Sequence, residues 1–573
     1  MSMFPHSNRT TLAVVAASLF LCLMFICSSS FAQNPTPVIG SSNTVTADPP
    51  VARPQNTPCV VQLFSGFQFI GFNIQSFQFT PPAGCPGPWE KIVFTADFNV
   101  TAGRQFDRTA VIDLGYVNIY FGTTPEPRHN LSPSWRVERD ETEYAALFTS
   151  PQTGHVILGN VVNSTFTGVI SGSAALEFYP AEGQGNLENG NKPADAVIPL
   201  TQSNGSGGIN EPAFLFTTTD QLATTLTLPQ NIERAYLDVI SQSQINDEFW
   251  YTCVPNDVTV ELQSCGNTAF REAEVSIDGQ PAGVAPVYPW IYTGGIDPFL
   301  WEPIPGVQAL NFVPYRVDLT PFAGVLSNGQ PHSVAVSVFN ADSWFSATGT
   351  LLLYLDHGSQ QVTGEVTTNT LSSAPNPSVK EELQTDSSGN VTGTVTTTAS
   401  RDFSIAGFVN TSRGRIDTQV TQNVNFNNTQ TFNITSSVYT QDVSQQTEVQ
   451  STTTTRHGPL TFQAHETFVY PLIVNYSLTF APDGSGSQLA TVSQELKNSL
   501  LTPYFASFVD NRVNSTDTLD FNSSGHITGN SGAKSSQSYN SFNTHGQKYS
   551  CTLTSENNAL TSASQGCTTT DQQ

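Results

Sequence analysis

The sequence predicts an all-β protein with two adjacent jelly-roll β-sandwich domains and a polar, β-rich C-terminal extension. Short runs of Val, Thr, Phe and Tyr are separated by Gly, Pro, Asn and Asp along most of the chain, which is typical of strands joined by turns. Phenylalanine, glycine and proline are abundant (37, 41 and 36 residues), methionine is rare (3), and long helical periods are hard to find. At 573 residues the chain is too long for one compact core.

The N-terminus has the pattern of a secretory signal. An apolar run from Leu12 to Cys27 follows "NRTT", and small residues, Ser30 and Ala32, follow it in "SSSFAQ". We therefore expect residues 1–32 to be a signal peptide that is cut after Ala32, so that the protein is secreted or periplasmic. A single-span membrane anchor is the alternative, although the apolar run is slightly short for one.

Six cysteines remain after this cut, and they fall as three sequence-local pairs. In an exported protein local disulfides are expected, although six cysteines allow other connectivities. No CxxC and no HExxH occurs, so we expect no metal and no cofactor. The disulfide candidates are Cys59 with Cys85, Cys253 with Cys265, and Cys551 with Cys567.

Composition divides the mature chain into regions. A Pro/Ser/Thr-rich leader over 33–58 precedes the first predicted jelly roll, 59–185. Residues 186–211 are rich in Gly and Asn and predict a linker or long loop, and 212–358 predict the second jelly roll.

The last region, 362–573, alternates small polar and β-branched residues, as in "TGTVTTTAS". A long flat β module or a solenoid-like extension would fit this pattern. It could help to bind a long substrate or only stabilise and space the protein, and the structural role is the favoured one.

The net charge limits the classes of molecule that the protein is expected to bind. The formal net charge is -25, from 46 acidic and 21 basic residues, which disfavours nucleic acid and anionic membranes. The same balance suggests tolerance of acid, and the sequence leaves the oligomeric state unknown.

The first candidate site is "GRQFDRTAVIDLG". Only 12% of the chain is charged, yet Asp107 lies between Arg104 and Arg108 just before an apolar strand. A carboxylate is expensive to bury there unless an arginine pairs with it and keeps it ionised. A purely structural ion pair at a strand end is the alternative.

The second candidate is "INDEFWYTCVPND", where Asp247 and Glu248 precede three aromatic residues. In a strand one acid would face a core or cleft, and a carboxylate beside aromatic rings would have a raised pKa that suits a general acid. A solvated acid pair beside a packed strand is equally compatible with the pattern.

Two further segments are candidates. "SWRVERDETEYAALF" contains Glu138 among other charges, which suits either a site or an exposed turn. "VYPWIYTGGIDPFLWEPIPG" combines a Gly-Gly turn with large aromatics that are hard to bury wholly and that predict a platform for sugar faces; rim packing between the sandwiches is the alternative. The aromatics are Tyr288, Trp290, Tyr292 and Trp301.

Taken together, these motifs resemble the peptide:N-glycanase A family. The resemblance covers about residues 80–357 and comprises six motifs in order. They are "CPGPWEKIVFTADFNVTAGRQFDRTAVIDLG", "WRVERDETEYAALF", "LGNVVNSTFTGV", "NDEFWY", "AEVSIDGQPAG" and "YTGGIDPFLWEPI".

The resemblance implies an amidohydrolase that cleaves the bond between Asn and the innermost N-acetylglucosamine of N-glycopeptides, in acid and without metal. It implies a site at the interface of two jelly rolls, with Asp107 and Glu248 as the catalytic acids. We add Glu138 as a third candidate acid. A glycoside hydrolase with the same acids and a non-catalytic glycan-binding protein remain alternatives. The expected substrate contacts are Arg108, Asp247, Trp250, Trp290, Tyr292, Asp297 and Trp301.

Two positions depart from the expected pattern. Asp297 and Glu302 stand where the resemblance leads us to expect an asparagine and a basic residue. We expect the extra acids to shift activity to lower pH.

Overall fold

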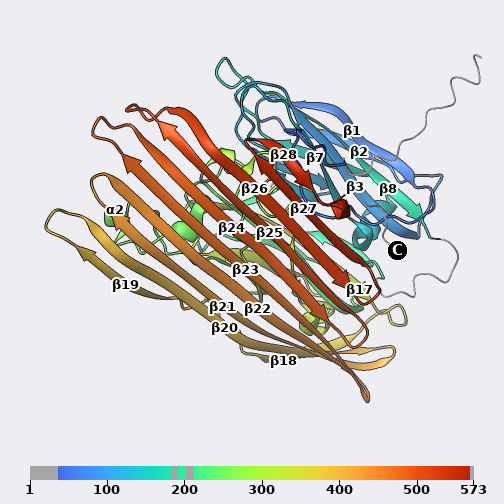
Figure 1. Ribbon diagram of the computed structural model, residues 1–573. Helices are drawn as coiled ribbons and strands as arrows, with labels where there is room; N and C mark the ends of the chain where they lie inside the picture. Colours follow the sequence, from blue (N-terminus) through green and yellow to red (C-terminus); the bar gives the residue numbers. More distant parts are fainter. Residues whose placement is uncertain (1–35, 182–191, 202–211, 568–573) are drawn as a thin grey trace, which may run out of the picture. The chain divides into compact units, whose positions relative to one another are not determined.

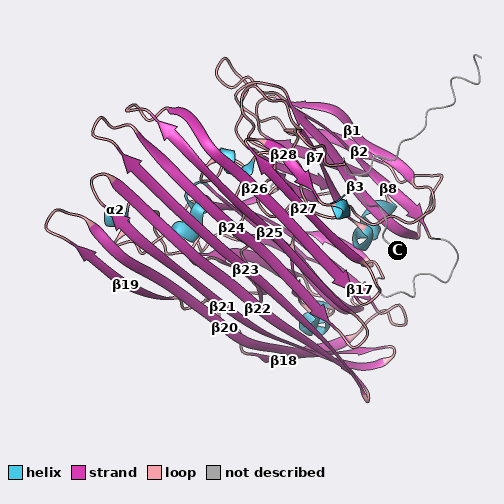
Figure 2. Ribbon diagram, in the orientation of Figure 1, coloured by secondary structure: helices cyan, strands magenta, loops and turns pink. Residues whose placement is uncertain are grey.

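The computed structural model describes residues 36–181, 192–201 and 212–567. The predicted signal peptide lies outside the described residues. The chain divides into two compact units, Met1–Thr36 and Pro37–Gln573, and everything below concerns the second. Strands dominate that unit, and its helices are short and lie in the connections between strands (Figure 2). The all-β prediction is confirmed.

Two four-stranded sheets form the first sandwich, in the orders β1-β8-β3-β6 and β2-β7-β4-β5. Their facing side chains form one hydrophobic core, which includes Phe94, Tyr120 and Phe178. The strands are β1 (Cys59–Phe69), β2 (Gln75–Phe79), β3 (Trp89–Val100), β4 (Thr109–Leu114), β5 (Val117–Thr123), β6 (Ser134–Asp140), β7 (Gln152–Leu158) and β8 (Ile170–Pro180), with helix η1 (Thr142–Thr149).

The second sandwich repeats this order, as β10-β17-β12-β15 and β11-β16-β13-β14. Both orders are compatible with the predicted jelly rolls. A short strand, β9 (Ala196–Pro199), pairs with β17 from within the predicted linker. The strands are β10 (Ala213–Leu215), β11 (Leu222–Leu226), β12 (Ile232–Gln244), β13 (Glu272–Ile277), β14 (Gln280–Pro286), β15 (Tyr315–Asp318), β16 (His332–Phe339) and β17 (Trp344–Leu355). The helices are η3 (Ile245–Thr252), α2 (Thr259–Leu262), η4 (Pro298–Trp301), η5 (Thr320–Phe322) and α3 (Ala323–Leu326).

The C-terminal region forms one antiparallel sheet of eleven strands (Figure 1). Alternate side chains are buried along its strands, as the period of two requires, and Phe403 and Phe426 share one core with Trp250 of the second sandwich. The strands are β18 (Thr363–Asn369), β19 (Ser378–Thr385), β20 (Val391–Thr411), β21 (Gly414–Ile434), β22 (Val438–His457), β23 (Leu460–Phe480), β24 (Gly486–Leu501), β25 (Ala506–Phe521), β26 (Ile527–Asn543), β27 (Lys548–Glu556) and β28 (Ala559–Ala563), followed by η6 (Gln565–Cys567).

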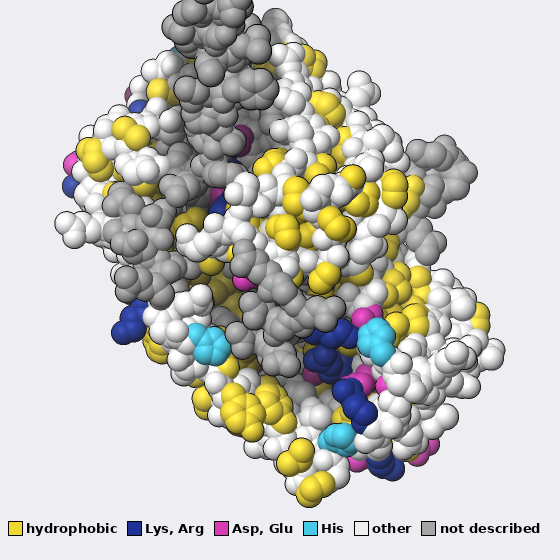
Figure 3. All heavy atoms as spheres, turned by 90° about the vertical axis from the view of Figure 1, so that its right-hand side faces the viewer, with side chains coloured by type: hydrophobic (Ala, Val, Ile, Leu, Met, Phe, Trp, Pro, Cys, Tyr) yellow, Lys and Arg dark blue, Asp and Glu magenta, His cyan; other side chains and the backbone are white. Residues whose placement is uncertain are grey.

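Three disulfides join the six cysteines of the described residues, and each joins a pair that the sequence predicted. They are Cys59–Cys85, Cys253–Cys265 and Cys551–Cys567. Among the described residues, no helix is long and apolar enough to cross a membrane. On the face in Figure 3, uncharged side chains cover most of the described surface, in keeping with the charge-poor sequence.

Candidate active site

Asp107 lies in the irregular segment between β3 and β4, and its carboxylate faces the Gly-Gly turn of the second sandwich. The backbone N–H of Gly294 donates a hydrogen bond of 3.0 Å to Asp107 Oδ2. The neighbouring Thr293 hydroxyl donates to the Thr124 carbonyl over 2.8 Å, so that the turn is bound to the first sandwich. The two sandwiches thus meet at Asp107.

A second carboxyl group, that of Glu126, lies beside Asp107 and was missed by the sequence reasoning. Its Oε2 accepts the Asp107 backbone N–H over 3.4 Å. A methyl group added at Gly294 would lie 2.4 Å from the same Oε2 and 3.1 Å from Asp107 Oδ1, so both carboxyl groups crowd this glycine. The available signal was an acid placed three residues after the fully buried strand β5.

Glu248 reaches the turn from the other side, on helix η3. A methyl group added at Gly295 would lie 3.5 Å from Glu248 Oε1. Ile245, the first residue of η3, has φ 52°, a backbone conformation that is strained for a β-branched residue and that is often found at functional sites. Three carboxyl groups therefore surround Gly294 and Gly295.

Burial and mutual repulsion give the three acids different tendencies to ionise. Burial, and then the negative charge of Asp107, raise the pKa values of Glu126 and Glu248 to about 8. Burial also raises the pKa of Asp107, but the Gly294 N–H and Arg108 oppose that rise. The cluster can therefore present a carboxylate at Asp107 beside two protonated acids, which is the division of roles that acid–base catalysis requires.

Of the two arginines near Asp107, only Arg108 acts on it. Arg108 is half-buried, and its backbone N–H donates to Thr124 Oγ1 over 2.9 Å. Burial lowers the pKa of its guanidinium, while Asp107 and Glu126 oppose that fall. The Arg104 guanidinium is exposed and stacks over Phe106 and Phe166, at 5.4 and 5.1 Å from the ring centres.

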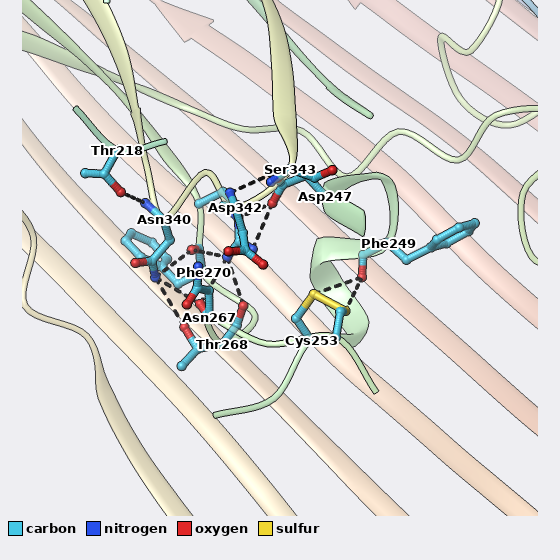
Figure 4. A network of polar contacts seen from close by, with 12 residues as sticks. Thr218, Asp247, Phe249, Cys253, Asn267, Thr268, Phe270, Asn340, Asp342 and Ser343 are labelled. Carbon is cyan, nitrogen blue, oxygen red and sulfur yellow. Dashed lines mark hydrogen bonds and ion pairs between the residues drawn. A yellow bond between two sulfur atoms is a disulfide. The ribbon is translucent and has the colours of Figure 1, made fainter. Parts of the chain in front are cut away.

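Asp247 does not join the cluster, although it is adjacent to Glu248 in sequence. Its Oδ1 forms a fully buried ion pair with Arg271 at 2.9 Å. Its Oδ2 accepts the backbone N–H groups of Asp342 and Ser343 over 2.9 and 2.7 Å (Figure 4). Adjacent acids thus have opposite surroundings, and Asp247 fixes η3 to the start of β17.

Glu138 also lies apart from the three acids. Its carboxylate is buried on β6 and pairs with Arg53 at 2.9 Å and Arg136 at 3.2 Å. Glu138 lines a cavity of about 630 Å³ together with Glu141 and Asp238, and Asp107 and Glu248 are not among the residues that line it.

The four predicted binding aromatics are buried. Trp250, Trp290, Tyr292 and Trp301 expose 1, 4, 3 and 2% of their surface. Tyr288 exposes 5%, so the expectation that the four loop aromatics are hard to bury wholly is wrong. The second sandwich and the C-terminal sheet together supply a larger core than one sandwich would. Tyr292 donates to the Ser243 carbonyl over 2.7 Å, and Trp301 Nε1 donates to the Gly295 carbonyl over 2.9 Å.

The two unexpected acids of the loop are buried as well. Asp297 caps η4 by accepting the Phe299 N–H over 2.9 Å, and burial raises its pKa to about 7. Glu302 pairs with Arg128 at 3.0 Å, and burial raises its pKa to about 7. Both side chains thus support the loop that presents Gly294.

Known families and structures resemble this chain. It matches the family described as peptide N-acetyl-β-D-glucosaminyl asparaginase amidase A over residues 50–372, and the C-terminal domain of PNGase A over 394–472. Peptide-N4-(N-acetyl-β-glucosaminyl)asparagine amidase A of Prunus dulcis is 32% identical over 412 residues, which cover 69% of this chain and 70% of the relative.

The solved structures that resemble this chain are less similar to it in sequence than the Prunus dulcis relative is. PNGase F, a glycosylasparaginase from Flavobacterium meningosepticum, is 14% identical with a TM-score of 0.35, and the match covers 52% of this chain and 96% of that one. PNGF-II is 13% identical with a TM-score of 0.37, and the match covers 52% of this chain and 65% of that one.

Proposed function

This chain belongs to the peptide N-glycanase A family, and from that premise we propose that it hydrolyses the amide between Asn and the innermost N-acetylglucosamine of N-glycopeptides and glycoproteins. The reaction consumes water, turns Asn into Asp and releases the glycan as a glycosylamine. The observation that carries the proposal is the convergence of Asp107, Glu126 and Glu248 on the Gly294–Gly295 turn.

Each acid has a role that its surroundings support. Asp107 is the base, because the Gly294 N–H and Arg108 stabilise its charge against the burial that raises its pKa. It takes a proton from a water molecule whose oxygen bonds to the side-chain amide carbon of the substrate. Glu248 is the acid, because its pKa of about 8 keeps it protonated in acid and at neutral pH. It gives its proton to the amide nitrogen as the carbon–nitrogen bond breaks.

The cycle closes when the proton passes from Asp107 back to Glu248. Glu126, with a pKa of about 8, is neutral in the same range, and its O–H can donate a hydrogen bond to the oxygen that develops negative charge without giving up the proton. A site with one carboxylate and two neutral acids works only while both glutamates stay protonated. We therefore propose activity from the acid range in which Asp107 is still ionised up to neutral pH, and a loss above about pH 8. At lower pH Asp107, whose pKa burial raises, takes up a proton and activity is lost as well.

We also propose that the protein is exported. Three disulfides in three separate regions support an oxidising compartment. N-glycoproteins are the substrates that such a compartment offers, so location and reaction agree.

The test compares acid-to-amide variants on a dabsylated N-glycopeptide. We expect Asp107→Asn and Glu248→Gln each to lower kcat by about 100-fold to 10,000-fold while the fold is retained. Asp402→Asn, an exposed acid on β20, is the matched control and should retain the wild-type rate. Near-wild-type rates in both folded test variants would refute the assignment of these two residues to the site. A sugar left on the Asn of the product would indicate a glycoside hydrolase instead.

A further inference from the structure

The C-terminal sheet holds a set of buried amide side chains that face the second sandwich. Asn428, Gln430 and Gln494 are fully buried, although amide groups are normally found at the surface. Burying an amide costs free energy unless it is hydrogen-bonded. The hydrogen-bond partners of these side chains therefore show which parts of the second sandwich the sheet holds in place.

One group of amides binds the end of η3, the helix that carries Glu248. Each donates to a different backbone carbonyl there, and these three consecutive carbonyls belong to the last two residues of η3 and the residue that follows it. Asn428 donates to Tyr251 over 2.8 Å, Gln441 to Thr252 over 2.9 Å, and Gln430 to Cys253 over 2.8 Å.

A single amide, that of Gln494 on β24, binds both ends of the loop that carries Gly294. Its Nε2 donates to the Pro289 carbonyl over 2.7 Å, and its Oε1 accepts the Val307 N–H over 2.8 Å. A methyl group at Gly306 would lie 2.7 Å from the Ile291 carbonyl oxygen and 3.1 Å from the same Oε1, so a glycine lets the two ends of the loop and this side chain approach closely. Gln488 adds a bond of 3.1 Å to the Ile296 carbonyl.

These contacts fix position more strictly than hydrophobic packing would. Apolar contacts tolerate small shifts, whereas a buried amide loses its partner when either element moves by about 1 Å. The sheet binds the helix of Glu248 and the loop of Gly294 through one rigid ladder of strands. Neither set of amides touches the three carboxyl groups, so their influence on the site is indirect.

We infer that the C-terminal sheet is a positioning element of the active site, whose buried amides set the placement of η3 and of the Gly294 loop relative to Asp107. The inference rests on the proposed amidase function. The sheet is then required for turnover, and Gln494 and Gln430 are positioning residues.

The test uses the full chain with Gln494→Met, which keeps the length of the side chain and removes both hydrogen bonds. Gln537→Met is the matched control, because Gln537 is equally buried in the same sheet but binds Ala47 N–H of the N-terminal segment over 2.6 Å. We expect kcat on the dabsylated glycopeptide to fall about 10-fold or more in Gln494→Met, with KM changed less than about 3-fold. In Gln537→Met we expect kcat within about 2-fold of wild type at a similar loss of thermal stability.

A conservative variant adds a readout that depends on the hydrogen bonds themselves. The neutral side chain in Gln494→Glu has one O–H donor and a carbonyl acceptor, which can replace the two hydrogen bonds that the amide makes here, and it loses the donor when it ionises. We expect its activity to approach wild type in acid and to fall at a lower pH than wild type does. Two results overturn the inference: folded Gln494→Met with wild-type kcat, or equal losses of kcat in Gln494→Met and Gln537→Met. An inactive wild-type protein would instead refute the proposed function.

Discussion

Replacing Gly294 with alanine tests the carboxyl cluster at its most crowded point. The added methyl carbon would lie 2.4 Å from Glu126 Oε2, whereas ordinary van der Waals contact begins at 3.4 Å. One of the two groups must therefore move by about 1 Å. The Asp107 carboxylate, at 3.1 Å from the same methyl, is also displaced, and its hydrogen bond from the Gly294 N–H is distorted.

The effect on activity should exceed the effect on stability. A misplacement of 1 Å in a catalytic group can lower the rate by about 100-fold, and we expect that loss in kcat/KM for Gly294→Ala. The atom that clashes is the end of a flexible side chain, so the free energy of unfolding should change by no more than about 1 kcal/mol. Gly295→Ala should be milder, because its methyl would come no closer than 3.2 Å to any atom, the Tyr292 carbonyl oxygen, and would lie 3.5 Å from Glu248 Oε1.

The assay is hydrolysis of a dabsylated N-glycopeptide, with denaturant unfolding measured on the same preparations. Gly529→Ala, where an added methyl has no neighbour within 4 Å, controls for the substitution itself. If folded Gly294→Ala retained more than about a third of the wild-type kcat/KM, the three carboxyl groups would not need the geometry described here.

Two further results are expected. Asp247→Asn should lower the free energy of unfolding by about 3 kcal/mol or more, because it leaves the Arg271 guanidinium buried without its counter-charge; an unchanged urea midpoint would contradict this. Burial raises the pKa values of Glu126, Glu141 and Glu248 from 4.5 to about 8, so the folded chain binds more protons than the unfolded chain between these values. The free energy of unfolding should therefore fall as pH rises from about 4.5 to about 8. A guanidinium midpoint that is as high at pH 8 as at pH 5 would contradict this direction.

Much of the architecture follows from patterns in the sequence. Turn residues and β-branched runs predicted strands throughout, and local spacing predicted the three disulfides that the structure contains. The long C-terminal strands follow from polar and β-branched alternation, but the single antiparallel sheet could not be distinguished from a solenoid. Both arrangements have the same period of two along each strand, and only pairing between distant strands separates them.

Only the parts of the site that have a local signal in the sequence could be predicted. The odd charges around Asp107 and the acid before the aromatic run at Glu248 are visible locally, and the structure brings these two acids to the same turn. Glu126 was missed because nothing in the sequence around it shows that the fold brings it to Asp107. The burial of Trp250 and Trp301 depends on the C-terminal sheet, which lies far along the chain: Phe426 packs on Trp250, and η4, which carries Trp301, lies against β25 and β26.

The most direct test of the central claim is the mass of the peptide product after incubation with an N-glycopeptide in heavy-oxygen water. Amide hydrolysis with water activated at Asp107 predicts a sugar-free peptide in which Asn has become Asp and carries one heavy oxygen in its new carboxyl group. A product that retains N-acetylglucosamine on Asn, or a glycopeptide that stays intact while bound, would contradict the account.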